Sequence, residues 1–278
     1  MKFGLHVLAI ADEFCLEEGV YAIQRQVPDL GVFVMIPSHH WNGKPQTDRS
    51  DEVRCVARKN GWVIDEIDMM KHFDSGPAHF VEASARNEAI RHIREAGYDR
   101  VLLMDTDELW MPGCFNDILW WIEECGTDCI YQNAVPVIGV PGCPVRGALD
   151  HGLVYISPSV RELTYVRSAW KPGEKPSQYG LTWTRITTRY MHFTMVRPTL
   201  EDVAAKCRTS THYGEKYYDF EPWIEGVLPN IRPGARNVSF FTDPAYRTNF
   251  WPEVGTFTPE EWSAIPDSLK SLLHPPIS

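Results

Sequence analysis

The sequence predicts an α/β protein with a mostly parallel central sheet flanked by helices and an irregular C-terminal region. Short apolar stretches alternate with helix-patterned stretches through residue 125, an order typical of parallel sheets. Prolines then recur between residues 136 and 176 and prevent long helices there. The 278 residues contain no repeat, low-complexity tract or evident linker. We therefore expect one domain over residues 1–278, with an N-terminal half at 1–125 and a C-terminal half at 126–278.

The expected elements follow in order along the chain. Apolar stretches that predict buried strands lie at residues 3–11, 31–36, 62–67 and 101–104. Helix patterns separate them, at about residues 16–26, 51–60, 77–96 and 115–125. The strand at 101–104 has no polar face, which places it centrally in the sheet. Residues 130–196 predict short strands and turns, followed by a capped helix after Thr199 and a short helix after Thr258.

Composition narrows the class of protein. Apolar residues make up 44% and charged residues 23%, which excludes wholesale disorder. No apolar run approaches the roughly 20 residues of a membrane-spanning helix, so no integral membrane association is expected. The seven cysteines contain no CxxC pair, which favours reduced thiols and a cytoplasmic location.

Two carboxylates follow the central strand directly, in the sequence VLLMDTDE at residues 101–108. Strand alternation would point Asp105 and Asp107 in similar directions, at the carboxyl edge where ligands of open α/β sheets collect. Two carboxylates at one point repel each other unless a cation lies beside them, and a hard divalent ion with phosphate oxygens as further ligands is the natural partner. An alternative is that both are loop acids capping the next helix.

Three segments together resemble GT-A-fold glycosyltransferases, in particular the family 2-like enzymes. The sequence MDTDEL at residues 104–109 resembles their Asp-x-Asp motif, and EASARNEAI at 82–90 is similar to the Ala-Arg-Asn helix that they place before it. The sequence YMHFTMVRP at 190–198, with Lys206 and His212 after it, resembles the histidine-bearing strand and following helix of the metal-dependent members. The resemblance spans roughly residues 80–215, and the first eighty residues match only in strand pattern.

The resemblance implies a metal site. Asp107 would bind the metal directly, and Asp105 would contact the nucleotide ribose or the metal through water. His192 would be the second protein ligand, which suits Mn²⁺ better than Mg²⁺ because imidazole is acceptable to Mn²⁺.

On the nucleotide side, the resemblance implies that Arg86 and Asn87 lie near the nucleotide and that Lys206 meets the diphosphate as a point charge. The expected cofactors are Mn²⁺ or Mg²⁺ and a nucleotide-sugar donor, with a UDP-sugar favoured. The Asp-Gly-Ser-type turn usual in the family is not visible near the N-terminus. The acid that binds the base and sugar of the nucleotide is therefore left open among Asp12, Asp65 and Asp68.

The implied reaction transfers the sugar to an acceptor hydroxyl with inversion at the anomeric carbon. A bound cation would neutralise the diphosphate as it leaves, and a carboxylate would take the acceptor's proton. Asp150 is the first candidate for this base, ahead of Glu162 and Glu174. Trp170 and Trp183 are candidates for stacking on the acceptor.

The acceptor itself stays open. The chain has a net charge of −10, but residues 151–210 carry nine Lys and Arg against four Asp and Glu, interleaved with Tyr and Trp. Such a stretch is usually a solvated face, although it also suits a polyanion. A hydroxymethylated pyrimidine in DNA, flipped out of the duplex, is the first acceptor to consider, beside a glycan or a small molecule.

Three other functions fit parts of the pattern. A haloacid-dehalogenase-type phosphatase also has Asp-x-Asp after a strand, but has Thr or Val where Leu109 stands. A nucleotidyltransferase would carry a Gly-rich basic loop after the first strand, where this chain has AIADEF at residues 9–14. A non-catalytic sugar- or nucleic-acid-binding module would bind its ligand without turnover.

Overall fold

The computed structural model describes residues 1–9, 15–41, 43–46, 49–148, 151–171, 173–210, 218–240 and 251–276. The strands are β1 (Phe3–Leu8), β2 (Gly31–Pro37), β3 (Val63–Ile67), β4 (Arg100–Asp105), β5 (Glu108–Trp110), β6 (Cys129–Ile138), β7 (Cys143–Arg146), β8 (His151–Ile156), β9 (Trp183–Met195) and β10 (Glu253–Val254). The helices are α1 (Leu16–Gln24), α2 (Arg49–Lys59), α3 (Ala78–Glu95), α4 (Cys114–Cys125), α5 (Leu200–Thr209), α6 (Phe220–Gly226), α8 (Pro259–Ala264) and α9 (Asp267–Lys270).

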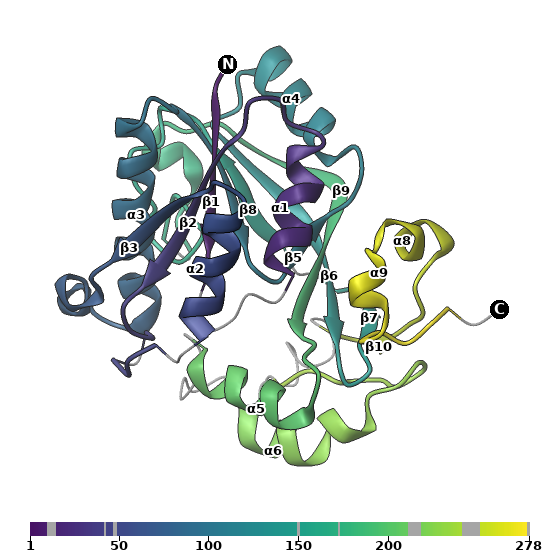
Figure 1. Ribbon diagram of the computed structural model, residues 1–278. Coiled ribbons are helices and arrows are strands. Elements are labelled where there is room, and N and C mark those ends of the chain that lie inside the picture. The colour runs from purple at the N-terminus through teal and green to yellow at the C-terminus, as the bar shows by residue number, and fades with distance from the viewer. Residues whose placement is uncertain are drawn as a thin grey trace.

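One ten-stranded sheet runs through both halves of the chain (Figure 1). Its main path is β10-β7-β6-β8-β4-β1-β2-β3, and β9 pairs with both β6 and β5. The four strands β3, β2, β1 and β4 are parallel, whereas β8 runs antiparallel to β4 and to β6. The predicted α/β class is confirmed, and the parallel part is the N-terminal half, where helices connect the strands.

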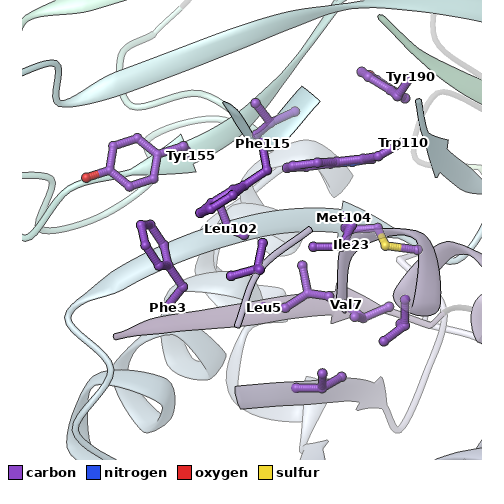
Figure 2. Packing of buried hydrophobic residues seen from close by; sticks show 14 of the residues in the cluster. Phe3, Leu5, Val7, Ile23, Leu102, Met104, Trp110, Phe115, Tyr155 and Tyr190 are labelled. Atoms are coloured by element: carbon purple, nitrogen blue, oxygen red, sulfur yellow. The ribbon is translucent and has the colours of Figure 1, made fainter. Parts of the chain in front are cut away.

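Helices cover both faces of the parallel strands, each through its apolar stripe. On one face, α1, α2 and α4 pack on a cluster that includes Leu5, Val7 and Met104. Figure 2 shows the side chains of β1 and β4 in this cluster close to Ile23 of α1. On the other face, α3 buries Ile90 and other apolar residues against β4. Each such side chain removed from water contributes roughly 1.5–3 kcal/mol, so both faces stabilise the sheet.

The central position predicted for residues 101–104 is confirmed, because β4 lies between β1 and β8. Gly97 caps α3 with φ +90°, and Thr199 accepts a hydrogen bond from the Asp202 amide at the start of α5, as their sequence positions predict. All seven cysteines are free thiols. No helix in the described part of the chain combines the length and apolarity needed to cross a membrane.

The C-terminal half brings β9 and α5 to the carboxyl edge of β4. The strand β9 is antiparallel to β5 and pairs His192 with Glu108 and Tyr190 with Trp110. The chain then turns into α5, which lies with α6 beyond the end of β9 (Figure 1). Residues more than eighty positions apart in sequence are thereby brought to one edge of the sheet.

Candidate active site

Asp107 lies in a turn just beyond the carboxyl end of β4. The strand ends at Asp105, and Thr106 and Asp107 form the turn that leads into β5. The predicted strand alternation therefore stops at Asp105, and the two carboxylates have different partners. The Phe193 amide donates to the Asp107 carbonyl at 2.8 Å, so the turn is fixed against β9.

Three positively charged or titratable side chains surround the Asp107 carboxylate, which is 6% exposed. The His192 Nε2 lies 3.5 Å from Oδ1. The Lys206 ammonium of α5 contacts Oδ2, and the Arg197 guanidinium lies 3.9 Å from the same oxygen. Arg197 is itself held by a hydrogen bond to the Phe193 carbonyl at 3.1 Å.

The charges around Asp107 decide its protonation state. Burial alone would raise its pKa, because a charged carboxylate is disfavoured away from water. Lys206, and after it His192 and Arg197, outweigh this effect and hold the pKa of Asp107 well below its usual value. The carboxylate is therefore ionised at neutral pH, and it can pair with positively charged groups.

Asp105 is held by two arginines instead. Its Oδ1 accepts a hydrogen bond from Arg86 Nη2 at 2.7 Å, and its Oδ2 accepts one from Arg167 Nη1 at 3.4 Å. Burial would raise the pKa of Asp105, but Arg86 and Arg167 lower it overall. The Asp105 side chain keeps 25% of its surface exposed, so its remaining lone pairs are open to a ligand.

Glu108 completes the group from below the surface. Its side chain is fully buried, contacts the Arg167 guanidinium, and accepts a hydrogen bond from the Asp105 amide at 3.3 Å. Burial raises the pKa of Glu108 to about 7, against the opposing influence of Arg167. On the far side of Asp105, Glu82 accepts a hydrogen bond from Arg86 Nε at 2.9 Å.

The donor set fits a divalent cation that is completed by ligands from a substrate. In the described residues, no three His, Cys, Asp or Glu side chains come together to hold a metal unaided. The Asp107 carboxylate and the His192 imidazole do converge, at 3.5 Å. One oxygen and one nitrogen ligand suit Mn²⁺, with phosphate oxygens in the remaining positions.

The other residues with an implied nucleotide role have defined partners. The side-chain amide of Asn87 binds both backbone groups of Leu163. Its Nδ2 donates to the Leu163 carbonyl at 2.9 Å, and its Oδ1 accepts from the Leu163 amide at 2.7 Å. It therefore anchors the segment after β8. Asp65 accepts hydrogen bonds from His92 at 2.8 and 3.1 Å within the sheet–helix interface. Asp68 lies past the end of β3 and is half exposed, and Asp12 falls outside the described residues.

The structure does not rank the candidate bases. Asp150 lies outside the described residues, as does His212. Glu162 and Glu174 are exposed, and Glu174 accepts a hydrogen bond from the Tyr179 hydroxyl. Asp150 stays the first candidate on sequence grounds.

The tryptophans expected to stack on an acceptor lie away from Asp107. Trp170 and Trp183 pack against each other and against Tyr131, with centroids 5.9, 5.2 and 6.2 Å apart. Trp183 begins β9, nine residues before His192, which places it up to about 30 Å from that residue at the rise of a strand. The stacking of these two rings on an acceptor stays a prediction, and it would take place at a distance from Asp107.

Four residues that sequence reasoning gave no role take part in the site. Arg197, Glu108 and Glu82 lie inside the three matched segments, so their positions gave a signal. For Arg167 the sequence held no such signal, apart from its place in the basic segment at residues 151–210. It reaches the site because its guanidinium also donates to the carbonyls of Leu103 and Leu153, at 3.1 and 2.9 Å.

Comparisons with known proteins found similar solved structures only. No protein-family model and no curated protein matches the sequence. The chain is similar to the crystal structure of S. aureus TarS residues 1–349 with UDP-GlcNAc, at 16% identity and a TM-score of 0.44, over 75% of this chain and 65% of that one. It is similar to S. aureus TarS at 13% identity and a TM-score of 0.45, over 98% of this chain and 50% of that one.

A third similar structure is glucosyl-3-phosphoglycerate synthase from Mycobacterium tuberculosis with Mn²⁺, UDP and glucosyl-3-phosphoglycerate. It shares 12% identity and a TM-score of 0.42 over 78% of this chain and 82% of that one. The chain thus spans less than two thirds of the length of the two TarS structures named first.

Proposed function

We propose that the protein is a glycosyltransferase of the GT-A type, which moves a sugar from a nucleotide-diphosphate sugar to an acceptor hydroxyl with the help of a divalent cation. We favour a UDP-sugar as donor, Mn²⁺ as cation and inversion at the anomeric carbon, as the motif resemblance implies. The seven free thiols fit a reducing compartment, and we place the reaction in the cytoplasm.

One observation carries the proposal. The Asp107 carboxylate, delivered past the end of a central parallel strand, meets His192 from β9 and Lys206 from α5. Each of the three comes from a different one of the matched or neighbouring segments, and the fold brings them together without any of them being adjacent in sequence. An ionised carboxylate, an imidazole and an ammonium at the carboxyl edge form a site for a cation and a diphosphate.

Each residue has a separate role in the proposed reaction. Asp107 and His192 would hold the cation, which supplies charge neutralisation for the departing diphosphate. Lys206 places a second positive charge beside it and binds phosphate oxygens. Asp105, ionised and partly exposed, accepts hydrogen bonds from hydroxyl groups of the nucleotide ribose. Asp150 is the proposed base for the acceptor hydroxyl.

A hydroxymethylated pyrimidine in DNA stays the first acceptor to test. The reason is the basic segment, which exposes Arg185 and Arg189 along β9. Binding through these residues would weaken steeply between low and physiological salt, because phosphate contacts release counterions. A flat salt response would remove the basis for a DNA acceptor and leave the glycan and small-molecule alternatives.

The decisive experiment is a screen of nucleotide sugars for Mn²⁺-dependent release of nucleoside diphosphate, which identifies the donor without knowledge of the acceptor. We expect release from at least one UDP-sugar, lost in Asp107→Asn and in excess chelator. Asp99→Asn is the matched control, since Asp99 is exposed and precedes the same strand at its opposite end. Binding without release would favour a non-catalytic module, and full activity in chelator would exclude the proposed use of a metal.

A further inference from the structure

The segment between β8 and β9 carries a side chain that nothing in the motif resemblance assigns. Arg167 lies in this segment, yet its side chain is only 9% exposed. Its guanidinium reaches under the carboxyl edge of the sheet and meets both Asp105 and Glu108. We propose that Arg167 is a positioning residue, which sets the orientation of Asp105 for the nucleotide. This inference rests on the proposed function.

The guanidinium is fixed from four sides. Its Nε and Nη2 donate to the Leu153 carbonyl of β8 at 3.2 and 2.9 Å, and Nη2 also donates to the Leu103 carbonyl of β4 at 3.1 Å. Nη1 is left for the carboxylates of Asp105 and Glu108. A planar fork held by two strand carbonyls has little freedom to rotate, so the position of Nη1 is set by the sheet itself.

The segment that carries Arg167 is anchored to α3. Arg94 donates to the carbonyls of Ser157 and Val160 at 3.1 and 2.7 Å. Asn87 binds both backbone groups of Leu163. Closer to Arg167, the Tyr131 hydroxyl donates to Ser168 Oγ at 3.3 Å. Several side chains therefore hold this segment in the position from which Arg167 can reach the carboxylates.

Arg167 and Arg86 approach different oxygens of Asp105. Arg86 is 1% exposed and binds Oδ1, while Arg167 lies at Oδ2. With a fixed guanidinium on each oxygen, the carboxylate has one orientation and its remaining lone pairs point in set directions. This orientation suits the role that the proposed function gives Asp105, which is to bind the nucleotide while Asp107 and His192 hold the metal.

The test compares Arg167→Lys with Arg94→Met. Lysine keeps a positive charge beside the buried Glu108, so the variant avoids an unpaired buried carboxylate, but it loses the fork that meets Asp105. Arg94→Met loosens the same segment without touching either carboxylate. We would measure the affinity for UDP in the presence of Mn²⁺ by calorimetry, and the binding of Mn²⁺ alone by its electron paramagnetic resonance signal.

We expect Arg167→Lys to weaken UDP binding by about 10- to 100-fold, the usual effect of removing a group that orients a ligand-binding side chain. Arg94→Met should stay within about two-fold of the wild type, and Mn²⁺ binding alone should be unchanged in both variants. Asp105→Asn should weaken UDP binding to a similar degree, and the double variant Asp105→Asn with Arg167→Lys should be no weaker than Asp105→Asn alone, because both act through one carboxylate.

Three results would overturn the inference. Equal losses in Arg167→Lys and Arg94→Met would show that Arg167 only holds the segment. Additive losses in the double variant would show that Arg167 does not act through Asp105. A weakened Mn²⁺ signal in Asp105→Asn would make Asp105 a metal ligand. Failure of the wild type to bind any nucleoside diphosphate with Mn²⁺ is a separate outcome, which overturns the proposed function and this inference with it.

Discussion

The surroundings of Asp105 and Asp107 differ sharply although the two residues are one position apart. Asp105 is held by Arg86 and Arg167, which come from the face of the sheet covered by α3 and from the segment after β8. Asp107 is met by His192 and Lys206, which come from β9 and α5. Asp105 thus has one partner from each half of the chain, whereas both of these partners of Asp107 come from the C-terminal half.

The two carboxylates also differ in the chemical type of the side chains that contact them. Arginine stays charged and binds carboxylates through a rigid fork, so the partners of Asp105 fix it in place. Imidazole is a metal ligand and an ammonium group is a mobile point charge, so the partners of Asp107 can share it with a metal and a diphosphate. The comparison teaches that an Asp-x-Asp pair can combine a fixed carboxylate for orientation with an exchangeable one for charge.

The largest effect should come from Asp107→Asn. The change removes the negative charge that is proposed to hold the cation, and it leaves Lys206 and Arg197 without their carboxylate partner. Several kcal/mol of charge stabilisation are lost, which corresponds to a fall in kcat of at least about 10³-fold. Nucleotide-sugar hydrolysis at saturating Mn²⁺ measures it, with Asp99→Asn unchanged as the control.

The same variant tests stability with a known sign. The pKa of Asp107 is lower in the folded protein than in the unfolded chain, so its charge stabilises the fold above the unfolded pKa of about 3.9. This contribution is lost as the pH falls below that value. Urea unfolding at pH 7 should show Asp107→Asn less stable than the wild type, with the gap closing toward pH 3. A gap that widens in acid would contradict the charges assigned around Asp107.

His192→Ala should have the next largest effect, and the effect should depend on metal concentration. The change removes a neutral ligand and leaves Asp107 in place, so the cation is bound more weakly but can still be supplied. We expect the Mn²⁺ requirement to rise by at least about 10-fold, with part of the lost activity recovered at high Mn²⁺. Tyr190→Phe, on the same strand, is the control. An unchanged Mn²⁺ requirement would remove His192 from the metal site and leave it a structural residue.

The sequence predicted one side of this comparison better than the other. Asp107, His192 and Lys206 were all inferred from motif resemblance, because each motif carries its residue at a recognisable spacing. The partner of Asp105 from the C-terminal half, Arg167, was not found. Its position depends on how a coil segment folds back over β4 and β8, and such segments have no hydrophobic period that a sequence reader can follow.

The fold shows the same division. The strands and helices of residues 1–125 were predicted close to their observed bounds, since burial on both sides gives parallel strands a continuous apolar signature. The antiparallel pairing of β5 with β9 was not predicted, because β5 is only three residues long and its partner lies about eighty residues later. That pairing places His192 next to Asp107. The candidate site therefore depends on a strand pairing that the sequence pattern does not predict.

Lys206→Met should have a moderate effect on binding. Among the charges that lower the pKa of Asp107, Lys206 has the largest influence. Lys206 is also the proposed contact to the diphosphate. A charge-assisted hydrogen bond contributes about 1.5–3 kcal/mol, so the KM for the nucleotide sugar should rise about 10- to 100-fold while kcat falls less. Arg208→Met on the same helix is the control, since Arg208 pairs with Glu221 on the surface. Equal effects of both variants would assign Lys206 to helix stability alone.

The smallest effect concerns His6, which reports on the fixed charges beside Asp105. His6 lies on β1, is fully buried, and neither ring nitrogen has a hydrogen-bond partner among the described residues. Burial, and after it Arg86, lowers the pKa of His6 to about 3 in the folded protein. The unfolded chain, with a pKa near 6.5, therefore binds more protons between these values, and the folded state loses stability as the pH falls through that window. At pH 5 the loss is about 2 kcal/mol relative to pH 7.5.

His6→Leu should remove this acid sensitivity, because leucine has no proton to gain. Urea unfolding of the wild type and the variant at pH 7.5 and pH 5 isolates the contribution, since all other titrating groups are shared. We expect the variant to gain about 2 kcal/mol on the wild type between the two pH values, because burial, and after it Arg86, keeps the ring neutral in the native protein. A constant difference between the two proteins would mean that His6 takes up its proton as readily in the folded protein as in the unfolded chain, which would contradict the lowered pKa.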